Sequence, residues 1–238
     1  AKDAAAVPEW AEFEHKAGER FTDFGRVRAE IELETARLCG DNCGVSIEPI
    51  LLRIFSPCVT DLTLVDLPGL TKVPTGDQPG DISERIRELV MRYISHRSCL
   101  ILAVSAGNND LATSDALALA REVDPHGERT LGVITKLDLA DESGSVVEAL
   151  QGNVYPLRLG YIGLVCRNEL HSKAGLSFDR AIENEAEFLQ RSRSFAPVAD
   201  RCGVPRLARR LHELLLAHVR ETLPNLRASV QCHADRCR

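Results

Sequence analysis

Residues 130–138 read TLGVITKLD and decide the fold class of the chain. The first six of them are almost continuously apolar, which is typical of a strand covered on both faces of a parallel sheet. The polar residues Lys136 and Asp138 follow directly, where ligands bind in an open α/β sheet. Similar short apolar runs predict further buried strands at residues 49–55, 62–65, 99–104 and 161–165.

Amphipathic segments separate these predicted strands. The first forty residues read as helical and charged, and helices are expected over residues 21–38, 82–94, 111–123 and 178–189. Thr22 or Asp23 is suited to cap the first of these helices, and Asp81 with Glu84 forms a capping box before the second. Phe24, Val27, Ile31 and Leu38 are expected near one face of the first helix. The alternation of strands and helices predicts a doubly wound, mostly parallel α/β sheet.

The C-terminal stretch has a different pattern. Pro205 opens a helix with an apolar stripe, and Pro224 is expected to end or kink it. The stripe consists of Leu207, Leu211, Leu214, Leu215 and Val219. Such a helix either packs on its own sheet or joins a bundle with another segment. The expected division is therefore residues 1–204 and residues 205–238.

Composition excludes several classes of protein. The net charge of −6 argues against a broad nucleic-acid surface. No apolar run approaches the ~18 residues that cross a bilayer, and the first residues lack a signal-peptide core, so a cytoplasmic protein is expected. Neither Cys39 with Cys43 nor the group Cys232, His233 and Cys237 has a second ligand pair, so reduced thiols are expected rather than a metal site.

A first motif follows the predicted strand at residues 62–65. Asp66 stands at its end and Gly69 three residues later. A carboxylate in this place can hold Mg²⁺ through water, and a glycine can offer its backbone N–H to a terminal phosphate. DxxG alone is very common, and by itself a plain strand and turn would be the better explanation.

A second motif, TKLD, occupies residues 135–138. The Asp138 carboxylate is placed to accept hydrogen bonds from N1–H and N2–H₂ of guanine, a donor pair that adenine lacks, and the stem of Lys136 can lie along the base. DxxG and TKxD follow successive predicted strands in the order that GTPases use, so together they predict a guanine-nucleotide domain. After residues 161–165, Cys166 is either part of a third base-side loop or a buried thiol.

Longer strings around these motifs resemble the dynamin family. They are residues 61–72 (DLTLVDLPGLTK), 76–79 (GDQP), 99–105 (CLILAVS), 110–116 (DLATSDA), 122–125 (EVDP), 128–139 (ERTLGVITKLDL), 155–166 (YPLRLGYIGLVC) and 223–226 (LPNL). The resemblance runs from about Trp10 to Arg227 and is closer to the dynamins proper than to the antiviral Mx branch.

The resemblance implies a P-loop-NTPase-like fold and a large, low-affinity GTPase that binds GTP or GDP with Mg²⁺. It implies self-association through the GTPase face, peripheral association with membranes and the cytoskeleton, and a role in membrane fission, as in endocytosis or on microtubules. The final helix resembles the bundle element that leads to the stalk, with Pro224 at its hinge.

The resemblance also assigns roles to individual residues. Asp66 would serve the magnesium and Gly69 the γ-phosphate. The residues that would read guanine are Thr135, Lys136 and Asp138, with Leu137 between them. Asp141 would help across a dimer of GTPase domains, and Arg167 and Asn168 would border the base. Cys166 stands where dynamins usually carry Asn.

A phosphate-binding loop requires Gly-Lys followed by Ser or Thr. The lysines are Lys2, Lys16, Lys72, Lys136 and Lys173, and none follows a glycine. Leu70 stands where Ras-like enzymes carry a water-orienting Gln. We therefore expect no retained catalytic residue, inefficient hydrolysis, and a strand missing between those predicted at residues 62–65 and 99–104. Because the sequence starts with Ala1, a fragment or a processed chain is expected.

Two functions compete on this basis. One is an incomplete copy of a GTP hydrolase; the other is a non-catalytic module that docks to dynamin-like partners through its switch-facing surface or its terminal helix. A dinucleotide enzyme lacks the required Gly-rich turn. The final helix carries Arg206, Arg209, Arg210 and Arg220, which could touch acidic lipid but are typical of a solvated face.

Overall fold

The computed structural model describes residues 9–40, 44–57, 61–70, 79–141, 144–168 and 175–236. The chain divides into two compact units, Ala1–Val90 and Met91–Arg238, called here the first and the second unit. Helix α2 (Ile82–Ile94) continues from one into the other.

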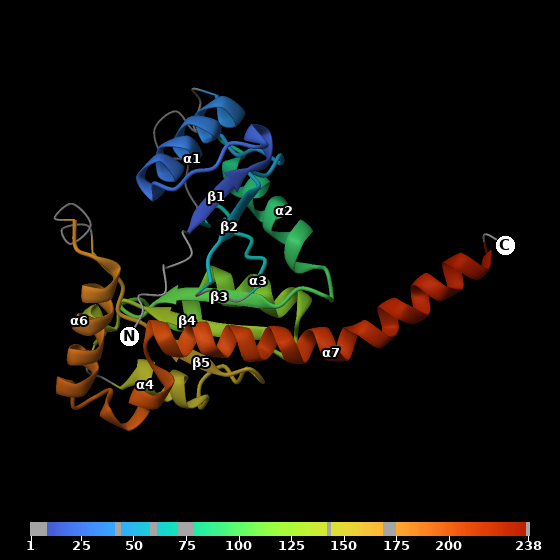
Figure 1. Ribbon diagram of the computed structural model, residues 1–238. Helices are drawn as coiled ribbons and strands as arrows, with labels where there is room; N and C mark the ends of the chain where they lie inside the picture. The colour runs from blue at the N-terminus through green and yellow to red at the C-terminus, as the bar shows by residue number, and fades with distance from the viewer. Residues whose placement is uncertain are drawn as a thin grey trace, which may run out of the picture. The chain divides into compact units, whose positions relative to one another are not determined.

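The second unit is built on a parallel sheet of three strands in the order β3, β4, β5 (Figure 1). They are β3 (Ile101–Ala106), β4 (Thr130–Thr135) and β5 (Tyr161–Gly163). Ile101 lies opposite Thr130, and Gly132 lies opposite Tyr161. The predictions of a mixed α/β fold and of these three parallel strands are confirmed.

Helices cover both faces of this sheet. On one face, the helices η2 (Leu111–Thr113), α3 (Asp115–Val123), α4 (Ser145–Gln151) and α6 (Phe178–Arg191) and the 3₁₀ segment η4 (Ala196–Arg201) contribute to a single apolar cluster. On the other face, α7 (Val204–Arg236) packs Leu214 against Leu131 and Val133 of β4 and Ile162 of β5. Alternate residues of β4 therefore enter different clusters, as a strand buried on both sides requires.

Helix α7 excludes one of the two effects expected of Pro224, which is an end of the helix. The helix does not end at Pro224 but continues to Arg236. Its first half lies along the sheet and its second half projects beyond it (Figure 1). Of the predicted stripe, Leu214 is buried whereas Val219 is 45% exposed.

The first unit contains a two-stranded antiparallel ribbon. Strand β1 (Trp10–Phe13) pairs with β2 (Leu52–Phe55), and the rings of Trp10 and Phe55 stack at 3.9 Å between centroids. Two predictions are therefore wrong. The start of the chain is not wholly helical, and the apolar run at residues 49–55 is not a buried strand of the parallel sheet, since Ile54 is 51% exposed. The partner that fixes β2 lies about forty residues earlier, which an apolar pattern alone does not reveal.

Helix α1 (Phe24–Cys39) begins as predicted, but only part of its apolar face is buried. Asp23 is its N-cap and accepts a hydrogen bond from the N–H of Gly25 at 2.8 Å. Of the apolar residues predicted on one face, Val27 is 5% exposed, whereas Phe24 is 43% and Ile31 37% exposed. The buried residues of the helix are Val27, Glu30 and Glu34.

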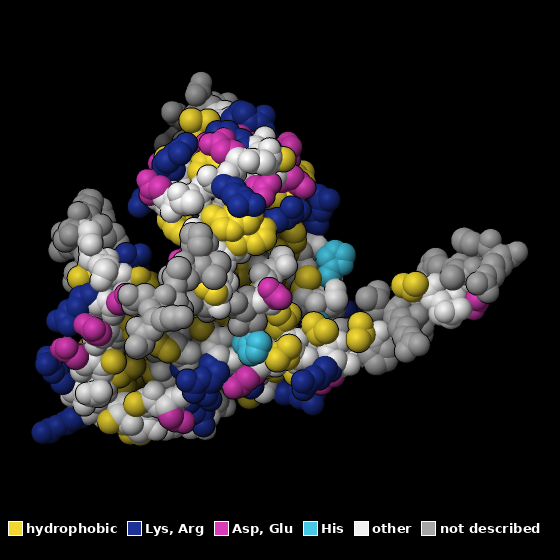
Figure 2. All heavy atoms as spheres, viewed as in Figure 1, with side chains coloured by type: hydrophobic (Ala, Val, Ile, Leu, Met, Phe, Trp, Pro, Cys, Tyr) yellow, Lys and Arg dark blue, Asp and Glu magenta, His cyan; other side chains and the backbone are white. Residues whose placement is uncertain are grey.

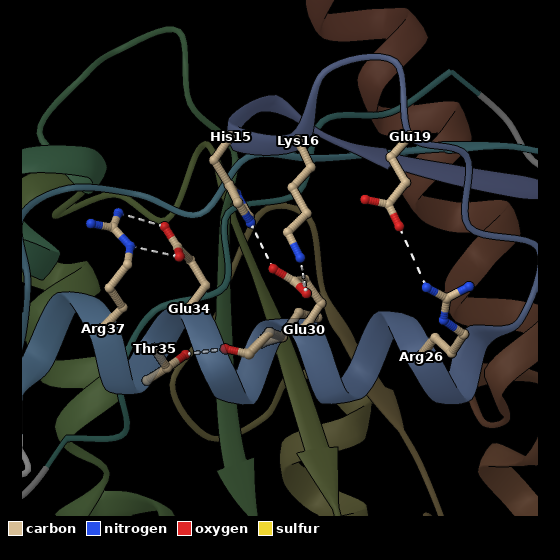
Figure 3. Close-up of polar contacts among 9 residues, drawn as sticks. His15, Lys16, Glu19, Arg26, Glu30, Glu34, Thr35 and Arg37 are labelled. Atoms are coloured by element: carbon tan, nitrogen blue, oxygen red, sulfur yellow. Dashed lines mark hydrogen bonds and ion pairs between the residues drawn. The ribbon is translucent and has the colours of Figure 1, made fainter.

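Cationic side chains make the burial of these two carboxylates possible (Figure 3). Glu30 accepts from Lys16 Nζ at 2.6 Å and from His15 Nε2 at 3.0 Å. Glu34 accepts two hydrogen bonds from Arg37. The hydrogen bond from Lys16, followed by that from His15, lowers the pKa of Glu30, and the bond from Arg37 lowers the pKa of Glu34. The polar side of α1 therefore faces inward because ion pairs neutralise it.

The run at residues 62–65 is not a strand. Residues 61–70 contain no regular secondary structure, and Leu64 is 69% and Val65 53% exposed. A run of apolar residues forms a strand only when a neighbour takes up its backbone N–H and C=O groups. No ladder within the described part of the chain includes this segment. Residues 71–78, which hold Lys72 and most of the GDQP string, lie outside the described residues.

Candidate functional site

The candidate site begins at the carboxyl end of β4. Thr135 is the last residue of this strand, and its carbonyl oxygen accepts from the N–H of Gly107 at 2.7 Å. Its hydroxyl donates to the carbonyl of Ser105 at 3.3 Å. Thr135 therefore joins the ends of β3 and β4 and fixes the point from which the next loop departs.

The loop after Thr135 alternates exposed and anchored side chains. Lys136 and Asp138 are exposed, whereas Leu137 is 1% exposed and belongs to the apolar cluster under the sheet. The helix η3 (Leu137–Leu139) starts here, and the N–H of Leu139 donates to the carbonyl of Lys136 at 3.0 Å. Burial of one side chain thus presents its two charged neighbours to solvent.

Lys136 has an unfavourable backbone conformation. Its φ of 57° and ψ of 42° lie in the left-handed region, which side chains with a Cβ rarely adopt. The anchored Leu137 and the end of β4 hold it there from both sides. Strain of this kind occurs where the surrounding structure needs the chain to turn abruptly, often at binding sites.

We expect Lys136→Gly to stabilise the second unit by about 0.5–1 kcal/mol, because glycine adopts this conformation without the Cβ clash. Lys136→Ala should leave the free energy of unfolding nearly unchanged, since alanine keeps the strain. Urea denaturation of both variants beside the wild type measures the difference. Equal stability of the two variants would contradict the strain.

The loop after β5 lies beside the loop after β4. The N–H of Leu137 donates to the carbonyl of Leu164 at 3.2 Å. Cys166 is exposed as a residue, but its thiol is partly buried, and this burial raises the pKa of the thiol. The nearby carboxylates of Glu185 and Asp138 raise this pKa further. Arg167 Nη1 donates to the carbonyl of Leu176 at 3.0 Å. Asp138 and Arg167 thus belong to two adjacent loops at one edge of the sheet.

The remaining predicted residues are distributed over both units. Asp66 and Gly69 belong to the first unit, and Asp66 is exposed. A Cβ added at Gly69 would meet nothing within 4 Å, so space is available beside its backbone. Asp141 and Asn168 belong to the second unit and are exposed. The second unit therefore holds Thr135, Lys136, Asp138, Asp141, Arg167 and Asn168, and the first unit holds Asp66 and Gly69.

Among the residues that the structure describes, the side chains form no metal site of their own. Within the described ranges, no group of three or more His, Cys, Asp and Glu side chains could hold a metal ion. Asp66 is one carboxylate, and Mg²⁺ held by one carboxylate needs waters and substrate phosphates to complete its shell. Cys39, Cys99, Cys166 and Cys202 are free thiols.

Sequence reasoning missed Glu185, which is 2% exposed and accepts backbone hydrogen bonds from Val165 and Val204. A signal for it exists in the sequence. Glu185 lies three residues after Ile182 and four before Leu189, so it falls on the apolar face of the predicted helix. A carboxylate in that position either destabilises the helix packing or has buried partners.

Comparison with known proteins gives two family matches. Residues 1–137 match the model of the dynamin family, and residues 145–238 match that of the dynamin central region. The chain is 50% identical over 229 residues to vacuolar protein sorting-associated protein 1 of Schizosaccharomyces pombe, which covers 96% of this chain and 34% of that protein. It is 50% identical over 226 residues to human dynamin-1, covering 95% and 26%. Dynamin-A of Dictyostelium discoideum is 47% identical over 230 residues, covering 97% and 27%.

The chain thus spans about a quarter to a third of the length of these relatives. None of the described helices is long and apolar enough to cross a membrane.

Proposed function

The chain belongs to the dynamin family, and from this premise we propose that it forms the guanine-binding part of a dynamin-like GTPase. The observation that carries the proposal is the loop at residues 135–138. Leu137 anchors it in the core, and Lys136 and Asp138 remain accessible at the carboxyl end of β4. Parallel α/β sheets bind ligands at this edge.

The proposed chemistry is recognition of the base. The Asp138 carboxylate accepts from N1–H and N2–H₂ of guanine, and the Lys136 stem covers one face of the ring. Arg167 and Asn168 border the base from the loop after β5, and Asp141 contributes across a dimer formed through the GTPase face. From the family resemblance, Asp66 would hold Mg²⁺ and the Gly69 N–H would serve the γ-phosphate.

We expect these 238 residues to hydrolyse GTP inefficiently. None of the lysines follows a glycine, so the sequence offers no phosphate-binding loop of the usual kind. We propose that residues 1–204 are an incomplete GTPase domain and that residues 205–238 lead to the stalk. The cellular role proposed from the relatives is that of a cytoplasmic GTPase, peripherally bound to membranes, that takes part in membrane fission.

The decisive test is nucleotide binding by the purified chain, with GDP and ADP compared by NMR titration of the backbone amides of residues 135–138. We expect weak binding, with a Kd of about 1 mM or above, and a preference for GDP. Asp138→Asn should weaken GDP binding about 10- to 100-fold, because a charged acceptor of two hydrogen bonds is lost.

Xanthosine diphosphate provides a gain of function in the same experiment. Xanthine carries a carbonyl where guanine has its amino group, so the side-chain amide that Asp138→Asn introduces can donate to it. The variant should therefore prefer the xanthine nucleotide. Asp179→Asn, which changes an exposed carboxylate on α6, is the matched control. Equal affinity for GDP and ADP in the wild type would refute base recognition.

A second function is favoured by the surface of α7. Leu216 is 42%, Val219 45%, Leu223 57% and Val230 61% exposed. Figure 2 shows hydrophobic side chains at intervals along this helix. Their spacing of three, four and seven residues suits a helical bundle. A non-catalytic module that docks to a dynamin-like partner through α7 would melt cooperatively and bind neither GDP nor ADP.

A further inference from the structure

Glu185 is a buried carboxylate whose place no base-binding motif explains. It is 2% exposed, whereas its neighbours on α6, Glu183 and Glu187, are exposed and pair with Arg180 and Arg191. Buried carboxylates occur almost only where hydrogen bonds or charges satisfy both oxygens. Glu185 meets this condition with two backbone N–H groups.

The two oxygens of Glu185 hold two separate segments. Oε1 accepts from the N–H of Val165 at 2.8 Å, and Oε2 accepts from the N–H of Val204 at 2.8 Å. Val165 lies directly before Cys166, at the start of the loop after β5. Val204 is the first residue of α7. The N-terminal N–H groups of a helix lack partners within it and carry partial positive charge, so a carboxylate is the group best suited to this place.

A second contact joins the same two segments. The N–H of Gly203 donates to the carbonyl of Gly163 at 2.9 Å, and Cys202 forms an isolated parallel bridge with Gly163. Side chains pack closely around Gly163 at this point. A Cβ added at Gly163 would lie 2.7 Å from Leu137 Cδ1 and 3.0 Å from Cys202 Sγ. The end of β5 is thus held between the start of α7 and the base-side loop after β4.

The contact continues to Asp138 through the backbone. Leu164, which precedes Val165, accepts from the N–H of Leu137, and Asp138 follows Leu137. A displacement of Val165 would therefore move the loop after β5 relative to Asp138. Sub-ångström placement matters here, because hydrogen bonds weaken steeply outside their usual distance and angle.

We propose that Glu185 is a positioning residue for base recognition, which fixes the loop after β5 against the start of α7 and so sets its distance from Asp138. The proposal rests on the function proposed above. Glu185 itself does not touch the nucleotide. Its two anionic oxygens hold both amides, whereas glutamine would offer one acceptor and a donor, and would leave one of the two N–H groups without its partner.

The test compares Glu185→Gln with Glu187→Gln, the same change at an exposed position of the same helix. Hydrogen exchange of the Val165 and Val204 amides reports the connection directly. GDP and IDP binding reports positioning, because hypoxanthine lacks the 2-amino group that Asp138 reads. We expect at least one amide of Glu185→Gln to exchange about tenfold faster and the ratio of GDP to IDP affinity to fall several-fold. Glu187→Gln should change neither.

The ratio separates positioning from a merely structural role, since partial unfolding lowers both affinities equally. Unchanged exchange at both amides would overturn the proposal, as would faster exchange with an unchanged ratio. If the wild type binds no guanine nucleotide, the function proposed above fails. Exchange of the Val165 and Val204 amides in Glu185→Gln still decides whether Glu185 connects the loop after β5 to the start of α7.

Should Glu185→Gln fail to melt cooperatively, Glu185→Asp replaces it. Aspartate keeps the charge and both acceptor oxygens on a side chain that is one carbon shorter. The exchange rates of the Val165 and Val204 amides and the ratio of GDP to IDP affinity should therefore lie between those of the wild type and those of a chain in which both hydrogen bonds are lost. A folded Glu185→Asp chain with faster exchange and a wild-type ratio would contradict the positioning role.

Discussion

Gly132→Ala is expected to destabilise the second unit by about 3 kcal/mol or more, which is a large part of a typical total of about 5–15 kcal/mol. A Cβ at this position would lie 2.2 Å from Cδ1 and 2.3 Å from Cε1 of Tyr161 on the neighbouring strand. The ring cannot turn aside easily. Tyr161 is 4% exposed, and its hydroxyl donates to the carbonyl of Tyr155 at 2.7 Å. Insertion of one methyl group therefore forces these two neighbouring strands apart.

Urea denaturation followed by the far-UV signal measures this loss. The double variant Gly132→Ala, Tyr161→Ala provides the control, because removal of the ring also removes the overlap. The two substitutions should cost less together than the sum of their separate effects. Additive costs, or a Gly132→Ala chain as stable as the wild type, would show that the ring is not tightly held over Gly132.

The central part of the fold could be predicted because its signals are local. The residues of β4 are apolar on both faces, and Lys136 and Asp138 follow without a break. Both the strand and the edge at which its loop lies follow from that pattern. The helices predicted over residues 82–94 and 178–189 repeat apolar side chains at helical spacing, and the structure contains them as Ile82–Ile94 and Phe178–Arg191.

The errors occurred where distant residues decide the outcome. Trp10–Phe13 becomes a strand because Leu52–Phe55 pairs with it, and the segment at residues 62–65 is not a strand because no ladder includes it among the described residues. Glu30 turns inward because Lys16 neutralises it from another element. For Trp10–Phe13 and Glu30 the local pattern is ambiguous, and a partner in another element selects one structure.

The candidate site shows the same limit. The order of the two motifs predicts which residues face a nucleotide, but the left-handed backbone of Lys136 results from the burial of Leu137 on one side and the end of β4 on the other. The role of Glu185 depends on Val204, nineteen residues later. Sequence alone indicates only that a charge lies on an apolar helical face.

The end of the sheet opposite the candidate site depends on Asp124, which is 8% exposed and follows α3. Its carboxylate accepts from the N–H groups of Glu128 at 2.9 Å and Arg129 at 3.0 Å and from Thr130 Oγ1 at 2.6 Å. The same turn places the Arg129 side chain, which donates to four carbonyl groups: those of Ile94, His96, Cys99 and Val123. Loss of the carboxylate therefore affects the ends of α2 and α3 and the start of β4 together.

Asp124→Ala is expected to lower the free energy of unfolding by about 3 kcal/mol, because three donors lose one shared acceptor in a largely buried place. Asp124→Asn should cost less, about 1–2 kcal/mol, since the amide oxygen keeps part of the acceptor role. Urea denaturation at neutral pH gives both values. An Asp124→Ala chain within ~0.5 kcal/mol of the wild type would contradict the network.

Acidification tests the charge of Asp124 separately from its shape. Burial alone would raise the pKa of this carboxyl, but the hydrogen bonds from Thr130, Arg129 and Glu128 outweigh burial and lower it below its ordinary value of 3.8. The folded state then binds the proton less readily than the unfolded state. The stabilisation is present above the ordinary value and is lost as the pH falls through the lowered pKa.

The difference in stability between the wild type and Asp124→Asn should therefore remain constant from pH 7 to about pH 5 and shrink below pH 4. If this difference in stability grew on acidification, the charged form of Asp124 would destabilise the folded state. The packing of Thr130 rather than its hydrogen bond to Asp124 would then stabilise this end of the sheet.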